Sequence, residues 1–310
     1  EKYKVYEEVV TRFSQDGVCR PNVTLTQGQV DMCREAITSY YNKVKYTIQT
    51  LQLNDVLESK GWSEFKLRCP GRYDMQVPEL EGESFDFLRE KAPWLDGVRA
   101  ILGEDAKFCV MGCMLSQPGS RTQQWHSDGD HLDDDEHLPP YAVNVFVPLV
   151  DMDPSLGPTE FIPTTHLLSN YDPDPPIPPV TFCTPAGEAL FFDYRVKHRG
   201  LGNRGTFARP MVYITYGAKA WADRENFNRK RYAKLPPLLE QRPPRSQLPL
   251  DRAERSKFLA QRNGASPEKG SSSAFQKAKG RVEDGQEGRK RQAEAVVEVA
   301  IQAKAKRGKR

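Results

Sequence analysis

An imidazole and a carboxylate lie two positions apart in the stretch from Gln123 to His131, where His126, Ser127 and Asp128 follow one another. In an extended chain, residues i and i+2 point to the same side, so His126 and Asp128 can both reach one ion while Ser127 faces away. These are metal-ligand types, but a polar turn after a strand uses the same residues. The pair alone leaves both interpretations open.

A second imidazole and a fixed cation lie downstream, at His198 and Arg209. Two histidines and one carboxylate on one face of an ion leave the opposite positions open. That arrangement suits non-haem iron(II) enzymes, which bind a co-substrate and oxygen there. Separation in the chain is no obstacle, because facing strands of a barrel can bring His126 and His198 together.

The first half of the chain shows helical patterns that we expect to pack outside such a site. A short amphipathic segment over residues 3–18 ends at an Asp-Gly turn. A capping box at Thr26 and Gln29 then predicts a long helix whose apolar positions continue to Ile48. Residues 51–83 are irregular, with a loop at 69–72, and a second helical stretch is expected over 85–102.

Short runs rich in β-branched and aromatic residues follow from Phe108 onward. They predict strands over 108–115, 141–150, 160–162, 180–182, 189–194 and 211–216. Helices first and many short strands later predict an α+β, mainly β fold. We expect a double-stranded β-helix (a cupin-like jelly roll) over about 106–219, within a domain over 1–235.

Residues 236–310 differ from the rest in composition. From Gln241 to Arg310 there are 18 basic and 8 acidic residues, and because the whole chain carries +3, the first 240 residues carry about −7. Few apolar residues remain here, so we expect a disordered basic tail without a core. Contact with nucleic acid or another acidic partner is one interpretation, and nuclear import or simple solubility is another.

Length and composition bound the class of protein. The 310 residues, 38% of them hydrophobic, suffice for one large domain with extensions. No apolar run reaches the roughly 18 residues that would predict a membrane span. Six cysteines without paired short spacings favour reduced thiols over a disulfide framework, so we expect an intracellular, cytoplasmic protein.

Four features in order make residues 106–219 resemble the phytanoyl-CoA dioxygenase-like family of iron(II), 2-oxoglutarate-dependent oxygenases. They are His126 with Asp128, the run 157–163 leading to His166, the run 192–200 with His198, and Arg209. The resemblance implies that His126, Asp128 and His198 bind iron and that Arg209 pairs with the distal carboxylate of 2-oxoglutarate. A guanidinium suits that task because its planar fork matches a carboxylate.

The resemblance also implies three further co-substrate contacts, at Gln123, Thr159 and Asn144, of which Asn144 could equally be a polar group of a strand. The expected reaction uses Fe(II), 2-oxoglutarate and O2 to hydroxylate a small-molecule substrate, with release of succinate and CO2. The acidic residues of 130–136 favour a cationic or neutral substrate over a polyanionic coenzyme A ester.

Two positions depart from the family's pattern. Gly200 stands where the family usually has a small polar residue, so one co-substrate hydrogen bond is missing or is supplied elsewhere. Thr164 stands at a turn position where a β-branched residue does not easily take positive φ.

Two other functions fit part of the pattern. In the first, the run from His126 to His131 belongs to a zinc-dependent hydrolase, although this leaves Arg209 unexplained. In the second, the jelly roll is an inactive scaffold and the basic tail binds nucleic acid. Of the remaining histidines, we expect His131 and His137 on the surface and His166 bracing the loop beside the site.

Overall fold

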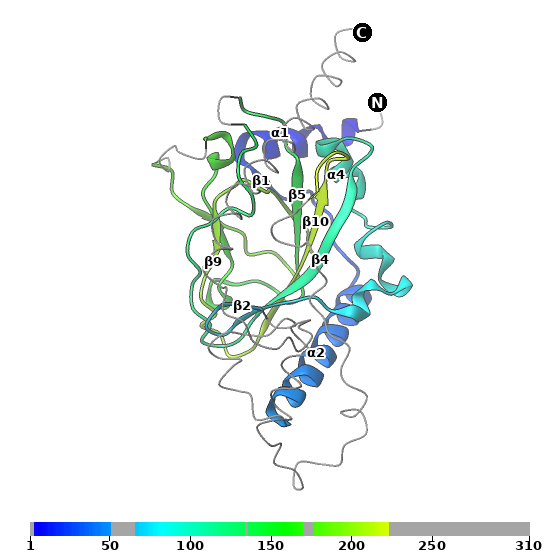
Figure 1. The fold of residues 1–310 in the computed structure, drawn as a ribbon, viewed down its shortest axis with the longest axis vertical. Helices are drawn as coiled ribbons and strands as arrows, with labels where there is room; N and C mark the ends of the chain where they lie inside the picture. The colour runs from blue at the N-terminus through cyan, green and yellow to red at the C-terminus, as the bar shows by residue number, and fades with distance from the viewer. Residues whose placement is uncertain (1–2, 51–65, 134–135, 170–175, 223–310) are drawn as a thin grey trace, which may run out of the picture.

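Two antiparallel sheets form the centre of the computed structural model, which describes residues 3–50, 66–133, 136–169 and 176–222 (Figure 1). In spatial order the larger sheet has β1 (Val18–Cys19), β8 (Leu190–Asp193), β5 (Ala142–Pro148), β10 (Arg209–Gly217), β4 (Lys107–Ser116), β3 (Arg72–Met75) and β2 (Lys66–Cys69). The smaller sheet has β7 (Val180–Thr181), β6 (Thr159–Phe161) and β9 (His198–Gly200). This arrangement confirms the predicted fold class, while the tail lies outside the described residues.

Two helices near the N-terminus carry apolar stripes. Helix α1 (Glu7–Asp16) follows the 3-10 turn η1 (Lys4–Tyr6) and ends at Gly17, whose φ of 76° is left-handed and whose N–H donates to the carbonyl of Phe13. Helix α2 (Gln27–Thr50) begins with the predicted capping box, in which the backbone N–H of Thr26 donates to Oε1 of Gln29 at 2.9 Å. The predicted long helix is therefore confirmed, and the short amphipathic segment before it is helical.

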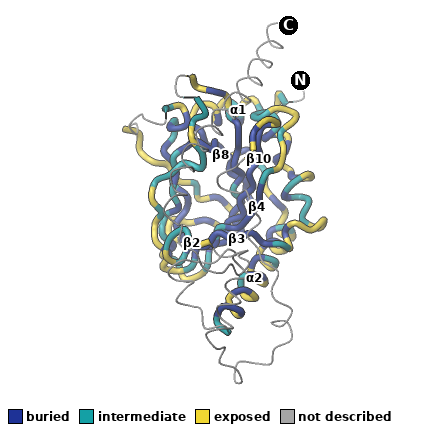
Figure 2. Tube along the Cα trace, in the orientation of Figure 1, coloured by how far each residue is buried: buried dark blue, intermediate teal, exposed yellow. Residues whose placement is uncertain are grey.

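The core lies between the larger sheet and these helices. Every residue of β5 except Phe146, and every residue of β8 and β10, is buried, and Figure 2 shows β8 and β10 in dark blue. From α2, residues such as Val30, Ile37 and Ile48 pack into the same cluster. Each fully buried aliphatic side chain contributes about 1.5–3 kcal/mol, so this cluster makes the larger sheet a rigid support.

The stretch 85–102, expected as one helix, is divided. It contains η3 (Glu83–Leu88), which follows η2 (Pro78–Glu81), and then α4 (Leu95–Leu102), which ends at Gly103 as expected. The helical dihedrals fail at Arg89, where φ is −126° and ψ is −98°. Pro93 lacks a backbone N–H and disfavours helical dihedrals in the preceding residue, so a continuous helix cannot pass through it.

The loop predicted at 69–72 is instead the turn of a hairpin. Strands β2 and β3 pair across Gly71, which has a φ of 77°, and β3 continues into the larger sheet by pairing with β4. The prediction missed both strands because they are only four residues long and are separated by a proline and a glycine. The hairpin brings Arg72 and Asp74 into the interior, where both are buried.

The turn before His166 has a positive φ at Thr164, although the sequence predicted that a β-branched residue does not easily adopt one. Thr164 has a φ of 69°, and its backbone N–H donates to the carbonyl of Asp16 at 3.1 Å. Thr164 precedes the 3-10 helix η5 (Thr165–Leu167). Another 3-10 helix, η4 (Pro154–Leu156), precedes β6. The tertiary contact offsets the local cost, which is on the order of 1–3 kcal/mol.

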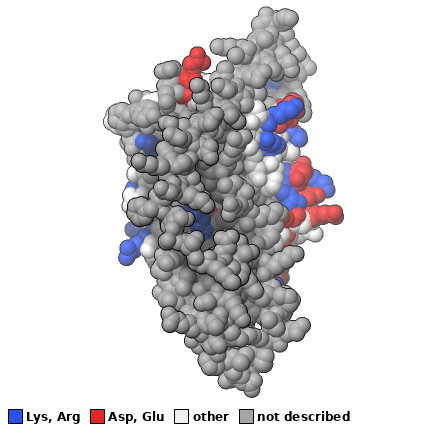
Figure 3. Space-filling model, in the orientation of Figure 1, with Lys and Arg blue, Asp and Glu red and all other residues white. Residues whose placement is uncertain are grey.

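Acidic and basic side chains alternate along one edge of the molecule, over the segment between β3 and β4 (Figure 3). Ion pairs there join Asp86 to Arg89 and Lys91. The mixture of signs gives this edge no strong field of either sign. Among the described residues, no helix has the length and apolar character needed to cross a membrane.

Candidate metal centre and co-substrate pocket

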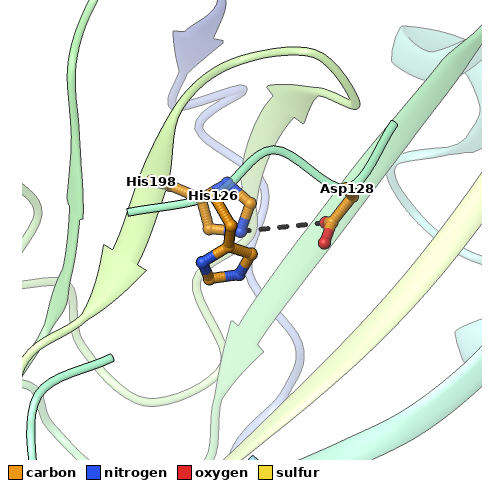
Figure 4. Close-up of side chains that lie close together, drawn as sticks. All are labelled: His126, Asp128 and His198. Atoms are coloured by element: carbon orange, nitrogen blue, oxygen red, sulfur yellow. Dashed lines mark ion pairs between the residues drawn. The ribbon is translucent and has the colours of Figure 1, made fainter. Parts of the chain in front are cut away.

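The three predicted metal ligands converge. The ligand atoms of His126, Asp128 and His198 all lie within 4.8 Å of one another, and Nε2 of His198 is 3.8 Å from Oδ2 of Asp128. Figure 4 shows the two imidazoles on adjacent segments and Asp128, on the segment that continues from His126, facing His198. Among the described residues, this is the group of histidine and carboxylate side chains able to hold a metal ion.

Backbone hydrogen bonds place the two histidines. His126 and His198 form an antiparallel bridge in which each backbone N–H donates to the other's carbonyl, at 3.1 and 2.8 Å. Their rings lie 4.5 Å apart between centroids. The bridge extends the smaller sheet beyond β9, so strand pairing brings the two ligands together as the sequence predicted.

Each imidazole is oriented by a backbone carbonyl. Nδ1 of His126 lies 2.9 Å from the carbonyl of Gln124, and Nδ1 of His198 lies 3.0 Å from that of Val196. Because a carbonyl only accepts, each Nδ1 carries the proton and each Nε2 presents a lone pair. Burial also lowers the pKa of His198, outweighing the opposite effect of Asp128, and this favours the neutral ring that binds metal.

Asp128 is held by its backbone and by Asn144. Its N–H donates to the carbonyl of Tyr194 at 3.0 Å, and its Oδ2 accepts from Nδ2 of Asn144 at 2.5 Å. Oδ1 of Asn144 in turn accepts from the hydroxyl of Thr215 at 2.5 Å. Asn144 therefore orients a predicted ligand, while its contact with the co-substrate stays a prediction.

A cavity of about 130 Å³ adjoins the three ligands. The predicted co-substrate residues Gln123, Asn144, Thr159 and Arg209 all line it. Thr159 lies opposite Gly200 in the register of β6 and β9. The fold thus gathers every predicted site residue around one cavity, from both sheets and from the loop before Asp128.

Arg209 is fully buried at the start of β10. The preceding loop is fixed by Asn203, whose Nδ2 donates to the carbonyls of Ser116 and Phe207. One terminal nitrogen of Arg209 donates to Oγ of Ser116 at 2.9 Å, and its Nε has no hydrogen-bond partner among the described residues. Burial, followed by the positive charge of Arg72, lowers the pKa of Arg209 to about 9.

Gln123 is engaged by its neighbours. Its Oε1 accepts from the backbone N–H of Gly200 at 3.1 Å and from Nη1 of Arg72 at 3.3 Å. These bonds place Gln123 at the junction of β9 and the β2–β3 hairpin. Its predicted contact with the co-substrate is not decided by them and stays a prediction.

The other histidines lie apart from the cluster. His166 is buried and its Nε2 lies 3.1 Å from the carbonyl of Ser14, so it braces the loop as expected. His137 is exposed, as expected, whereas His131 is only half-exposed, with its ring 6.0 Å from that of His137. Neither His131 nor His137 belongs to the group around His126. The zinc-hydrolase interpretation, which takes the run from His126 to His131 as its site, therefore lacks His131 as a further ligand.

Sequence reasoning missed Arg72 and Asp74, which also line the cavity. Asp74 accepts hydrogen bonds from Tyr213 at 2.7 Å and from Nε of Arg68 at 3.0 Å. A weak signal was present, because polar residues alternate with Tyr73 and Met75 after a glycine turn. The pairing of β3 with β4 gives that pattern its meaning.

The residues present fit iron(II) and 2-oxoglutarate. Two neutral imidazoles and one carboxylate are suitable donors for the metal. The Nε–H of Arg209 lacks a protein partner among the described residues, and a carboxylate can accept from it. A 2-oxo acid reaching from the ligand cluster to Arg209 would satisfy both ends of the cavity.

The family model described as phytanoyl-CoA dioxygenase (PhyH) matches residues 13–211 of the chain. The non-heme alpha-ketoglutarate-dependent carbocyclase SnoK from nogalamycin biosynthesis is similar in structure, with a TM-score of 0.51 and 16% identity over 70% of this chain and 85% of that chain. EvdMO1 has a TM-score of 0.51 and 19% identity over 69% of this chain and 50% of that chain. These two structures show a shared fold.

Proposed function

Because this chain belongs to the phytanoyl-CoA dioxygenase family and is a 2-oxoglutarate-dependent non-haem iron oxygenase, we propose that it hydroxylates a small-molecule substrate beside His126, Asp128 and His198. The observation that carries the proposal is the convergence of these three side chains, whose ligand atoms lie within 4.8 Å of one another while Nδ1 of each imidazole is held by a backbone carbonyl. Such a set occupies one face of an ion and leaves the opposite face for co-substrate and oxygen.

The co-substrate supplies the oxidising power. When iron(II), 2-oxoglutarate and O2 are bound, oxidative decarboxylation to succinate and CO2 allows an unactivated C–H bond of a second molecule to be hydroxylated. The protein must hold that bond close to the metal and keep water away. The presence of Asp128 as a third protein ligand favours hydroxylation over halogenation, which would need that position for a halide.

Arg209 is proposed to bind the distal carboxylate of 2-oxoglutarate. The guanidinium is buried and fixed by Ser116, so little conformational entropy is lost when it pairs with an anion. Gln123 and Thr159 are proposed to complete the walls around the co-substrate. Asn144 is proposed to hold the Asp128 carboxylate and to face the co-substrate with its remaining N–H.

The first experiment replaces one ligand. His126→Ala should abolish both iron binding, measured by metal analysis, and succinate formation, measured with 2-oxoglutarate and O2. His137→Ala is the matched control, because His137 is exposed and lies outside the ligand group. Unchanged iron content and turnover in His126→Ala would overturn the ligand assignment.

The second experiment addresses the substrate. In a metabolite library screened for stimulated succinate release, at least one small molecule should stimulate the reaction, and stimulation by none would contradict the small-molecule proposal. The hypothesis of a cationic or neutral substrate stays a prediction. Asp130 and Glu136 are exposed and do not line the cavity, and residues 134–135 lie outside the described residues. The best stimulation by acyl-CoA esters would contradict that hypothesis and leave the ligand assignment intact.

A further inference from the structure

Each of the two ligand histidines has a large neighbour in the chain that faces away from the cavity. Trp125 precedes His126, and Arg199 follows His198. Successive side chains of an extended segment point to opposite faces. His126 and His198 line the cavity, whereas Trp125 and Arg199 do not, so these two neighbours lie on the outer face of the smaller sheet.

Arg199 connects Trp125 to strand β6. Its guanidinium carbon lies 4.2 Å from the centroid of the Trp125 ring, and its Nε donates to Oε2 of Glu160 at 2.7 Å. Glu160 lies opposite Arg199 in the register of β6 and β9. The arginine therefore contacts both an aromatic face and a carboxylate, and we call Trp125, Arg199 and Glu160 the outer stack.

The inner face carries the metal ligands on the same three segments. Phe161, next to Glu160, lies opposite His198, and its ring stacks on that imidazole with the centroids 5.8 Å apart. His198 in turn bridges to His126, the neighbouring imidazole in Figure 4. The outer stack thus joins, from behind, the segments that carry Phe161 and both histidines.

Strand pairing holds the two histidines unequally. His198 belongs to β9, which pairs with β6 along its whole length. His126 lies in the connection between β4 and β5, and its pairing with His198 is an isolated bridge. A backbone hydrogen bond from Gln123 to the carbonyl of Gly200, at 2.9 Å, also joins the two segments. A side chain that fixes Trp125 against β9 therefore limits the movement of His126.

We propose that Arg199 is a positioning residue for the metal centre, which holds the His126 segment against β9 through the face of Trp125. The inference rests on the proposed function, because it takes His126 as a metal ligand. The side chain of Arg199 is 31% exposed, so its ion pair with Glu160 should add little to global stability. The order that it gives to His126 before the metal binds should add to metal affinity.

The test compares metal affinity with folding. Co(II) binding is measured without oxygen by competition with a chelator, and the absorption spectrum of bound Co(II) reports the ligand geometry. Arg199→Met keeps the aliphatic stem and removes the cation, and should weaken Co(II) binding about 3- to 10-fold and alter the spectrum. A lower urea midpoint of the metal-free protein with unchanged Co(II) affinity and spectrum would mean that Arg199 only supports the structure, and would overturn the proposal.

A double-mutant cycle tests whether Arg199 acts through Trp125. Trp125→Leu should weaken Co(II) binding by a similar factor. The double variant Trp125→Leu with Arg199→Met should bind within about twofold of the weaker single variant, because both changes remove the same contact. Trp125→Phe keeps an aromatic face and should retain most of the affinity. Losses that multiply in the double variant would contradict action through Trp125.

Controls separate this proposal from the proposed function. Arg204→Met removes an exposed positive charge from the loop after β9, outside the outer stack, and should leave Co(II) affinity within about twofold. If Arg199→Met does not fold, Arg199→Lys keeps the charge but loses the planar group that stacks on the indole, and should still weaken Co(II) binding. Failure of the unaltered protein to bind Co(II), or binding unaffected by His126→Ala, would overturn the proposed function. Tight binding that depends on His126 but not on Arg199 or Trp125 would overturn this inference alone.

Discussion

Two kinds of buried arginine lie in this fold, and they differ in what neutralises them. Arg195 and Asp193 are each 1% exposed and form a two-pronged ion pair, with Nε and Nη2 donating to the carboxylate at 2.8 Å. Arg72 and Arg209 are equally buried but face no acidic partner among the described residues. The first pair is complete within the protein, whereas Nε of both Arg72 and Arg209 has no hydrogen-bond partner among the described residues.

The pKa values reflect this difference. Against the effect of burial, the charge and hydrogen bonds of Asp193 raise the pKa of Arg195, and Arg195 lowers the pKa of Asp193. For Arg209, burial and the charge of Arg72 act together, and the pKa falls. A buried cation whose surroundings disfavour its charge is stabilised when an anion binds beside it, which is consistent with the proposed role of Arg209.

The largest effect on stability is expected from breaking the buried ion pair between Arg195 and Asp193. Arg195→Met leaves the Asp193 carboxylate buried and unpaired, and should reduce the free energy of unfolding by about 3–5 kcal/mol in urea denaturation. Lys219→Met is the control, because Lys219 and Asp105 are 72% and 69% exposed and such pairs contribute about 0–1 kcal/mol. Equal losses in the two variants would show that Arg195 has no special structural role.

The counterpart is Arg209→Met, which removes an uncompensated charge. The free energy of unfolding without ligand should change by less than about 1 kcal/mol, because no buried charge is left unpaired and only the neutral Oγ of Ser116 loses a donor. Binding of 2-oxoglutarate should weaken about 100-fold in a calorimetric titration of the Ni(II)-loaded protein without oxygen. If the ligand-free variant unfolds as readily as Arg195→Met, the distinction between the two kinds of arginine fails.

A smaller effect is expected at Asn144, which holds Asp128. Asn144→Ala should weaken metal binding about tenfold, measured by competition with a chelator, because the carboxylate loses the donor that orients it. Thr215→Val should shift the affinity in the same direction but less, since it acts through Asn144. Unchanged metal affinity in Asn144→Ala would exclude a positioning role.

The smallest effect concerns His131, near the Asp193–Arg195 pair. Burial, followed by the charge of Arg195, lowers the pKa of His131 to about 4. Below pH of about 6.5 the unfolded chain binds a proton that the folded protein excludes, so stability falls as the pH drops from there toward 4. Because His131 is only half-buried, we expect less than about 1 kcal/mol.

Urea denaturation at pH 7 and pH 5 measures this effect. The loss of stability between the two values should be smaller in His131→Gln than in the unaltered protein, because the substituted side chain does not titrate. An equal loss in both would assign the pH dependence to other groups. His137→Gln is the companion variant: burial, followed by the charge of Arg195, also lowers the pKa of His137, so this substitution should likewise reduce the loss.

The metal ligands and the main strands were predictable because their signals are local. His126 and Asp128 share one side of an extended segment, and strand-forming residues recur through β4, β5 and β10. Two predictions failed for different reasons. The contact of Thr164 with Asp16, which is distant in the chain, holds a positive φ. The helix expected over 85–102 is divided at Pro93, a local signal that the predicted helix did not take into account.

By itself, the sequence determined the chemistry available: which side chains can bind a metal or a carboxylate, and at what spacing. The tertiary structure alone decided that Arg72, in a stretch expected to be irregular, shares a cavity with Arg209 and fills the space before Gly200. The physical reason is that strand register is a long-range property. Two residues become neighbours through their common partner Ser116, and no local pattern around either one encodes that pairing.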